Sequence, residues 1–294
     1  MNLRERLIDP RSPDRRPRRA AYALPTLFTA ANIFLGFYAL LAIFQGAILM
    51  TQDPYAASLQ FKFAAMAIGA AVFFDGLDGR IARMTNTTSE FGRELDSLAD
   101  VITFGIAPAA LAFVWGVYFV PLSQGKILEH LRNAGYFLSF MYLLCGAARL
   151  ARFNIQTNPI PKNPGRPDRK YFVGLPIPAG AGMIASIVYA VDGAPLEWWV
   201  FSVAWLILTG LLAFLMVSTW RYPSFKDLAL TRPLSPLTII LVAGLIYVIS
   251  IFSQPMLLGM CAAYVGSGIV IRAGGIVRRR LRPSPPHAPE HQVG

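Results

Sequence analysis

The sequence predicts an all-α protein: a polytopic membrane helical bundle of about eight transmembrane helices, with both termini cytoplasmic. Three observations support this fold class. Of the 294 residues, 55% are hydrophobic and only 15% are charged, whereas a soluble domain has about 25% charged residues. The apolar residues form blocks long enough to cross a bilayer, which takes ~20 residues per helix. The basic residues gather beside the ends of these blocks, as topology signals do.

The apolar blocks define the expected helices in chain order. The first block begins near Leu24 and is too long for the apolar core of a signal peptide, so we expect a retained helix. The polar segment 155–172 carries four prolines, which prevent regular helix and separate the fourth block from the fifth. The expected helices span 24–47, 58–82, 93–120, 132–153, 174–193, 197–219, 234–252 and 255–274.

The positive charges predict how the bundle is oriented. An even number of spans places both termini on the same side of the membrane. With the N-terminus inside, all 27 basic residues except Lys62, Lys126 and Arg132 fall on or near the internal side, in agreement with the positive-inside rule. We therefore expect a multi-pass protein of the inner, cytoplasmic membrane, with the internal helix ends facing the cytoplasm.

Composition divides the chain into three parts. Residues 1–20 form a basic juxtamembrane segment, 21–275 the membrane domain, and 276–294 a basic, Pro-rich tail that we expect to be disordered. The formal charge of +11 lies largely in the terminal clusters, where it suits anionic lipid head groups rather than nucleic acid. Cys145 and Cys261 lie in apolar stretches, and we expect two buried small hydrophobes rather than a disulfide or a metal pair.

Four aspartates form a cluster that an apolar chain does not require. Asp75 and Asp78 are three residues apart and share one face of a helix. Asp96 and Asp100 are four residues apart on the next helix, and the short turn at 84–91 can bring the two pairs face to face. One carboxylate at a helix centre in a bilayer costs roughly 2.5–3.5 kcal/mol, and four close together repel one another. Two divalent cations would balance these charges and could bridge phosphoryl oxygens in an in-line displacement.

Residues beside the aspartates suit the same chemistry. Arg83 can neutralise phosphate charge, and Gly79 and Gly92 allow a backbone or a substrate to approach closely. Asp100 lies at the edge of the set and could instead act as a general base on an acceptor hydroxyl. The pattern predicts metal-dependent chemistry on a phosphorylated substrate at a membrane surface.

The segment 75–100 reads D-x2-D-G-x2-A-R-x8-G-x3-D-x3-D. This pattern resembles the signature of the CDP-alcohol phosphotransferase family, and every specified position of that signature is present. The resemblance implies metal-dependent transfer of a substituted phosphate from a CDP-linked donor to an alcohol, with release of CMP, by a homodimer. It implies two Mg²⁺ or Mn²⁺ ions at Asp75, Asp78, Asp96 and Asp100, with Asp100 also serving as base. It implies CDP contacts at Asp78, Gly79, Ala82, Arg83 and Gly92.

The acceptor alcohol depends on residues outside the signature. Arg149 and Arg152 are three residues apart at the internal end of the expected fourth helix. They suit an anionic acceptor, either the carboxylate of serine or the phosphate of glycerol 3-phosphate or inositol phosphate. The strings A-R-L-A-R-F-N at 148–154 and F-V-G-L-P-I-P-A-G at 172–180 resemble the phosphatidylserine synthase branch, which uses CDP-diacylglycerol and L-serine.

Other interpretations stay open at this point. Another acceptor, such as glycerol 3-phosphate, inositol phosphate or choline, is compatible with the same signature. A divalent-cation transporter is a further alternative, because intramembrane carboxylates also mark ion pathways. The remaining expected helices are nearly free of acidic residues, which disfavours a transporter. In the first helix, Asn32 is interpreted either as a polar residue of the ligand cavity or as an interhelical hydrogen-bond partner.

Overall fold

The computed structural model describes residues 19–85, 90–120, 125–156, 171–223 and 252–281. Nearly all of this part of the chain is helical, which confirms the predicted all-α membrane bundle. The remainder consists of connecting turns and a short pair of strands, described below. The helices are α2 (Arg19–Leu49), α3 (Pro54–Thr85), α4 (Glu90–Asp100), α5 (Ala107–Phe113), α6 (Gly125–Gln156), α7 (Ile177–Ala190), α8 (Trp199–Val217) and α10 (Ser253–Leu281).

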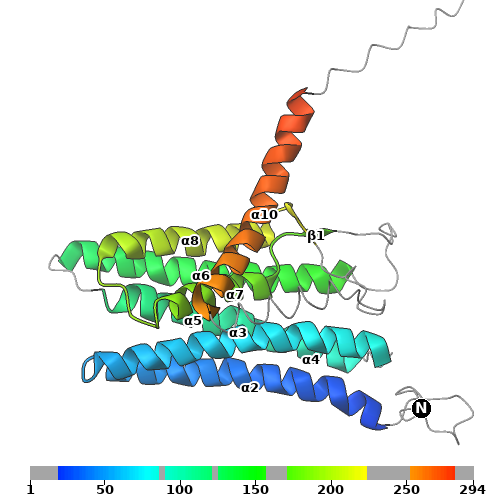
Figure 1. The fold of residues 1–294 in the computed structure, drawn as a ribbon, viewed down its shortest axis with the longest axis horizontal. Helices are drawn as coiled ribbons and strands as arrows, with labels where there is room; N and C mark the ends of the chain where they lie inside the picture. Colours follow the sequence, from blue (N-terminus) through cyan, green and yellow to red (C-terminus); the bar gives the residue numbers. More distant parts are fainter. Residues whose placement is uncertain (1–18, 86–89, 121–124, 157–170, 224–251, 282–294) are drawn as a thin grey trace, which may run out of the picture.

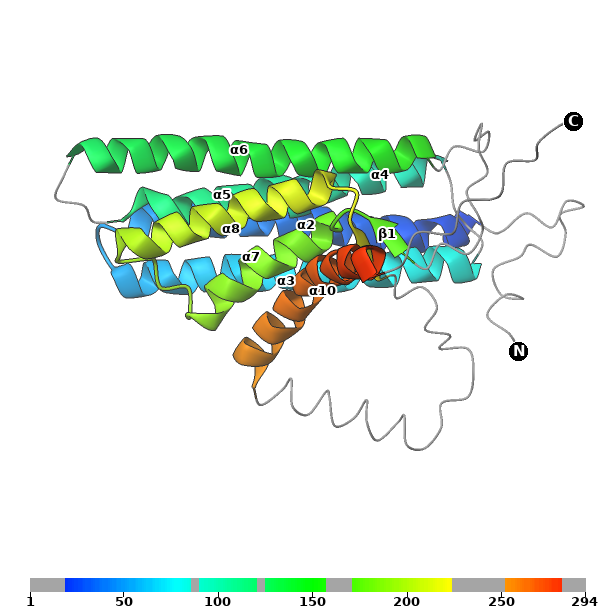
Figure 2. The ribbon, with the colours of Figure 1, turned by 90° about the horizontal axis from the view of Figure 1, so that it is seen from above.

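The long helices pack along a common direction. Figure 1 shows α2 and α3 side by side in one layer and α6 beside α8 in another, and both pairs are in contact. The helix α10 crosses this bundle at a steep angle, and its C-terminal half projects away from the other helices. Figure 2 shows α10 next to α7, with which it is in contact. The helix continues to Leu281, past the predicted domain boundary at 275.

Six helical stretches in the described part of the chain are long and apolar enough to cross a membrane. The helix α7 is shorter than the span expected at 174–193. Its 14 residues extend only about 21 Å at 1.5 Å per residue. Pro176, in an extended conformation, precedes the helix, and Asp192 and Gly193 follow it with positive φ. The expected helix at 234–252 lies almost entirely outside the described residues, so the total of eight and the side of the termini stay predictions.

The helix expected at 93–120 is continuous but not regular. A π-helical segment, η1 (Val101–Ile106), follows α4, and a second one, η2 (Val114–Tyr118), follows α5. Pro108 has no N–H group to donate to the Phe104 carbonyl four residues earlier. The hydroxyl of Tyr142 donates to that carbonyl instead, over 3.2 Å. Trp205 Nε1 likewise donates to the carbonyl of Ala112, over 2.9 Å. Side chains from α6 and α8 therefore hold this helix in place.

Small residues bring the helices close together. A Cβ atom added to Gly36 of α2 would lie 2.9 Å from the Cα of Thr103 in η1. Alanines also line the contact between α2 and α3, including Ala39 and Ala64, both fully buried. Large apolar side chains such as Phe44 point outward and are exposed. Along α2, this arrangement of small residues inside and large ones outside is typical of helices packed in lipid.

The sequence did not predict the two short strands. The strand β1 (Tyr171–Val173) pairs antiparallel with β2 (Arg221–Pro223), with Phe172 opposite Tyr222. Gly174 follows β1 with a φ of 79° and donates its N–H to the carbonyl of Trp220 over 2.8 Å. Strands of three residues are too short to give an alternating pattern. They tie the chain before α7 to the chain after α8, at the end of the bundle where α10 crosses.

Candidate functional site

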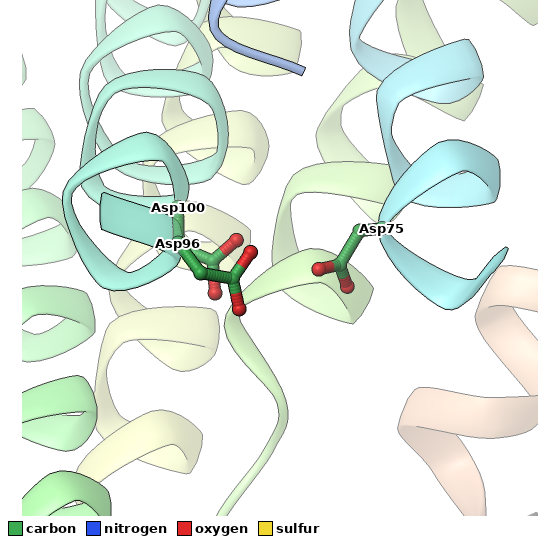
Figure 3. A group of neighbouring side chains, drawn as sticks. All are labelled: Asp75, Asp96 and Asp100. Carbon is green, nitrogen blue, oxygen red and sulfur yellow. The ribbon is translucent and has the colours of Figure 1, made fainter. Parts of the chain in front are cut away.

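Three carboxylates meet between α3 and α4. One carboxylate oxygen from each of Asp75, Asp96 and Asp100 lies within 4.8 Å of the other two. Figure 3 shows Asp96 and Asp100 projecting from one helix toward Asp75 on the other. The i, i+4 spacing on α4 aligns the first two, and the antiparallel course of α3 and α4 supplies the third. The structure thus brings together three of the four predicted aspartates, from both halves of the signature.

The environment of the carboxylates changes along α4. Asp100 is only 9% exposed, whereas Asp75 and Asp96 are half-buried. Asp100 is the last residue of α4 and is followed directly by η1. The carboxylate next to the membrane interior is therefore the most dehydrated member of the group.

The helix α2 forms a third side of this site. The rings of Phe28 in α2 and Phe74 in α3 lie 6.3 Å apart, centroid to centroid. Thr103 of η1, one turn beyond Asp100, donates its hydroxyl to the backbone carbonyl of Asn32 over 3.0 Å. These two contacts fix α2 against both helices that carry the aspartates.

The arginines of α6 differ in their surroundings. Arg149 is half-buried and lies close enough to interact electrostatically with Asp100 and with Tyr264 of α10. Arg152 is exposed. Of the two predicted acceptor residues, the structure places Arg149 near the carboxylates, whereas Arg152 lies at the surface of the described protein.

Two residues of this region had no predicted role. Asn154, at the end of α6, donates to Ser97 of α4 over 2.9 Å. Tyr264 donates its hydroxyl to the carbonyl of Pro223 in β2 over 3.3 Å. Asn154 stood within the string that resembles the phosphatidylserine synthase branch, which was the only signal for it. A tyrosine in an apolar helix far along the chain gives no signal of its own.

The other signature positions are placed only by their backbone. Asp78, Gly79, Ala82 and Arg83 continue α3 beyond Asp75, and their side chains lie outside the described residues. Gly92 is in the first turn of α4 and is half-buried. Their predicted contacts with CDP therefore remain predictions.

The three carboxylates fit a divalent cation. All the ligands they offer are hard oxygens, which Mg²⁺ and Mn²⁺ prefer. Carboxylates within 4.8 Å of one another repel strongly unless protons or cations offset their charge. Their arrangement on two helices, with one member buried, is thus compatible with the implied metal centre.

Comparison with known proteins agrees with this geometry. Residues 22–217, about two thirds of the chain, match the model of the CDP-alcohol phosphatidyltransferase family. The chain belongs to this family. It is accordingly an enzyme, a transferase embedded in the membrane, and the matched region contains the three carboxylates as well as Arg149 and Arg152 of α6.

Individual members of the family are similar over most of the chain. A CDP-diacylglycerol–serine O-phosphatidyltransferase of Helicobacter pylori is 37% identical over 253 residues, which cover 79% of this chain and 91% of that protein. The protein of the same name from Bacillus subtilis is 34% identical over 203 residues, covering 69% of this chain and 91% of the relative. One from Saccharomyces cerevisiae is 37% identical over 163 residues, which are 55% of this chain and 52% of that protein.

Proposed function

We propose that this CDP-alcohol phosphatidyltransferase transfers the phosphatidyl group of CDP-diacylglycerol to the hydroxyl of L-serine, giving phosphatidylserine and CMP. The observation that carries the proposal is the carboxylate cluster of Asp75, Asp96 and Asp100, in a chain whose relatives bear the name of this serine transferase. The cluster supports phosphoryl chemistry, and the relatives support serine as the acceptor.

The aspartates have separate tasks in the proposed reaction. Asp75, Asp78, Asp96 and Asp100 would hold two Mg²⁺ or Mn²⁺ ions, which supply positive charge that polarises the pyrophosphate of the donor. Asp100 takes the proton of the serine hydroxyl on a carboxylate oxygen. The serine oxygen then bonds to the β-phosphorus, which carries the diacylglycerol, and the bond from that phosphorus to the CMP oxygen breaks. CMP leaves with the electron pair of that bond.

Arg149 suits the carboxylate of serine. Its Nε is buried and has no hydrogen-bond partner among the described residues, and its guanidinium lies within electrostatic range of Asp100. A bound carboxylate would satisfy the guanidinium and place the serine hydroxyl near the proposed base. Arg152, one turn further and exposed, would attract the acceptor from the surface.

The donor would lie along the opposite side of the site. The backbone of α3 carries Gly79, Ala82 and Arg83 beyond Asp75, and we propose that they contact the CDP moiety together with Asp78 and Gly92. The acyl chains would lie among the apolar helices. We propose further that the enzyme is a homodimer of the cytoplasmic membrane, with this site facing the cytoplasm and the basic flanks contacting anionic lipids.

An acceptor panel tests the serine assignment. Purified enzyme in lipid nanodiscs receives CDP-diacylglycerol, Mn²⁺ and one acceptor at a time: serine, glycerol 3-phosphate, inositol phosphate or choline. We expect CMP release and labelled phospholipid with serine alone. Since Arg149 would also suit a phosphate, product with glycerol 3-phosphate or inositol phosphate and none with serine would overturn the assignment while leaving the family chemistry intact.

A further inference from the structure

Asn32 stands out as a buried polar side chain of α2, the helix that borders the carboxylate site. It is 2% exposed, and neither its Oδ1 nor its Nδ2 has a hydrogen-bond partner among the described residues. Its backbone carbonyl, by contrast, accepts the hydroxyl of Thr103. Leaving a buried amide without partners is costly, so such groups call for an explanation.

The position of Asn32 connects it to the site. Gly36, one turn further along α2, packs directly on Thr103, so Asn32 and Gly36 share the face of α2 that contacts η1. Thr103 lies one turn beyond Asp100 on its own helix. In the opposite direction along α2, Phe28 lies one turn before Asn32. The ring of Phe28 contacts the ring of Phe74, which is next to Asp75 in α3. The helix α2 is in contact with both helices that carry the aspartates.

The buried serines do not present the same problem. Ser139 in α6 and Ser202 in α8 also have hydroxyls without partners in the described part of the chain. A serine hydroxyl has one proton and can turn toward a carbonyl of its own helix. An asparagine amide has two N–H donors and an acceptor, fixed in one plane, which a helix backbone does not satisfy.

We propose that the side-chain amide of Asn32 binds the donor, donating from Nδ2 to an oxygen of the pyrophosphate held at the carboxylates. The inference rests on the proposed function and adds a third helix to its binding site. A neutral amide suits this place, because a further acidic side chain would repel the phosphate and a basic one would pair with the aspartates. The donor supplies the anionic acceptor that the buried amide lacks in the protein alone.

Two substitutions of Asn32 distinguish phosphate binding from metal binding and from a role in folding alone. Asn32→Leu has similar size and removes all polar atoms, so it should fold as well as the wild type or better. Loss of a hydrogen bond to a charged group should raise the KM for CDP-diacylglycerol about 10- to 100-fold. Asn32→Asp adds a negative charge and should weaken donor binding further. Ser202→Ala serves as the matched control, because it likewise removes a buried polar group that has no partner among the described residues. This variant should keep the wild-type KM.

The measurements are donor affinity, by titration of CDP-diacylglycerol in nanodiscs without acceptor, and Mn²⁺ affinity, by electron paramagnetic resonance. The proposal expects weaker donor binding in both Asn32 variants, with Mn²⁺ affinity in the absence of donor unchanged in Asn32→Leu. Tighter Mn²⁺ binding by Asn32→Asp together with weaker binding by Asn32→Leu would make Asn32 a metal ligand and overturn it. Wild-type donor affinity in Asn32→Leu would overturn it too. Failure of the proposed function would differ, because the wild type itself would then lack serine-dependent CMP release.

Discussion

The side-chain amide of Asn154 donates to the hydroxyl of Ser97 over 2.9 Å, which ties the end of α6 to the helix that carries Asp96 and Asp100. Ser97 in turn donates to the carbonyl of Arg93, one turn earlier on α4, over 3.1 Å. Asn154 lies at the same end of α6 as Arg149. The pair therefore sets the distance between the proposed acceptor site and the carboxylates.

Replacing Asn154 by Leu should loosen this connection and slow the reaction. The loss of one hydrogen bond costs about 0.5–1.5 kcal/mol of stability. A small displacement of reacting groups lowers the rate by up to about 100-fold. The kcat should therefore fall by a larger factor than the small loss of stability, measured as the thermal midpoint, would explain. Steady-state kinetics with serine and differential scanning fluorimetry measure both. Unchanged kcat in a variant that has lost stability would limit the pair to a structural role.

Removing single carboxylates should abolish activity in distinguishable ways. Asp75→Asn and Asp96→Asn should weaken Mn²⁺ binding at least about 10-fold, because each removes an oxyanion from the cluster. Asp100→Asn should weaken Mn²⁺ binding as well and, with Mn²⁺ at saturation, should still lower kcat by about 10²- to 10⁴-fold, the range for loss of a general base. Paramagnetic resonance titration and CMP release report the two effects.

Asp53 provides the control for the aspartate variants. It caps the start of α3, where its Oδ1 accepts the N–H groups of Tyr55 and Ala56 over 3.1 and 3.0 Å. Asparagine caps a helix as well as aspartate does, so Asp53→Asn should keep both activity and Mn²⁺ binding. Wild-type Mn²⁺ affinity and full turnover in Asp96→Asn would contradict the metal role.

The sequence predicted the carboxylate site because local spacing encodes it. Asp96 and Asp100 share a face by helical periodicity alone, and a short turn between adjacent helices can bring Asp75 to them. The π-helical turns around Pro108 escaped prediction, because they depend on hydrogen bonds from Tyr142 and Trp205 on distant helices. Contacts between segments far apart in the chain leave no periodic pattern.

The acceptor side of the site illustrates the same limit. The sequence singled out Arg149 and Arg152 by their spacing at the internal end of a helix, and the structure places Arg149 near Asp100. Tyr264 reaches Arg149 only because α10 crosses the bundle and the two short strands bring Pro223 beneath its hydroxyl. Neither the crossing angle nor three-residue strands can be deduced from hydropathy.

Gly36→Ala should destabilise the contact between α2 and η1. The new Cβ would lie 2.9 Å from the backbone Cα of Thr103, which cannot move aside as a flexible side chain would. Overpacking of this kind costs about 1–3 kcal/mol, and the shift of α2 should also weaken donor binding through Asn32. Thermal unfolding and donor titration measure the two consequences.

Gly69→Ala is the counterpart on α3. A Cβ at Gly69 meets no atom within 4 Å in the described part of the chain. Alanine in a helix interior is favoured over glycine by about 0.5–1 kcal/mol, so this variant should be as stable as the wild type or more so. Equal thermal midpoints for Gly36→Ala and Gly69→Ala would contradict this prediction. They would show that the close approach of α2 to Thr103 does not contribute to the free energy of unfolding.

Asp192 should make stability depend on pH at the end of the bundle away from the carboxylates. Lys62 Nζ and Gln254 Nε2 each donate to Asp192 Oδ1 over 2.6 Å. Together these hydrogen bonds join α3, the turn after α7 and the start of α10. These hydrogen bonds, that of Lys62 first, lower the pKa of Asp192 below its ordinary value. Because the pKa of Asp192 is lowered in the folded state, its contribution to stability is complete above the ordinary pKa of about 3.9. This contribution is lost as pH falls through the lower pKa of the folded protein.

The comparison of wild type with Asp192→Asn tests this dependence. At about pH 6 the wild type should have a slightly higher thermal midpoint, the difference being small because the pair is largely exposed to solvent. As pH falls through the lowered pKa of Asp192, protonation removes its charge, so the two midpoints should converge. High salt at about pH 6 should narrow the gap as well, since it screens exposed charges. A gap that persists unchanged below the lowered pKa would contradict the ion pair. It would leave the geometry of the turn, where Asp192 has a φ of 55°, as the source of the difference in midpoint.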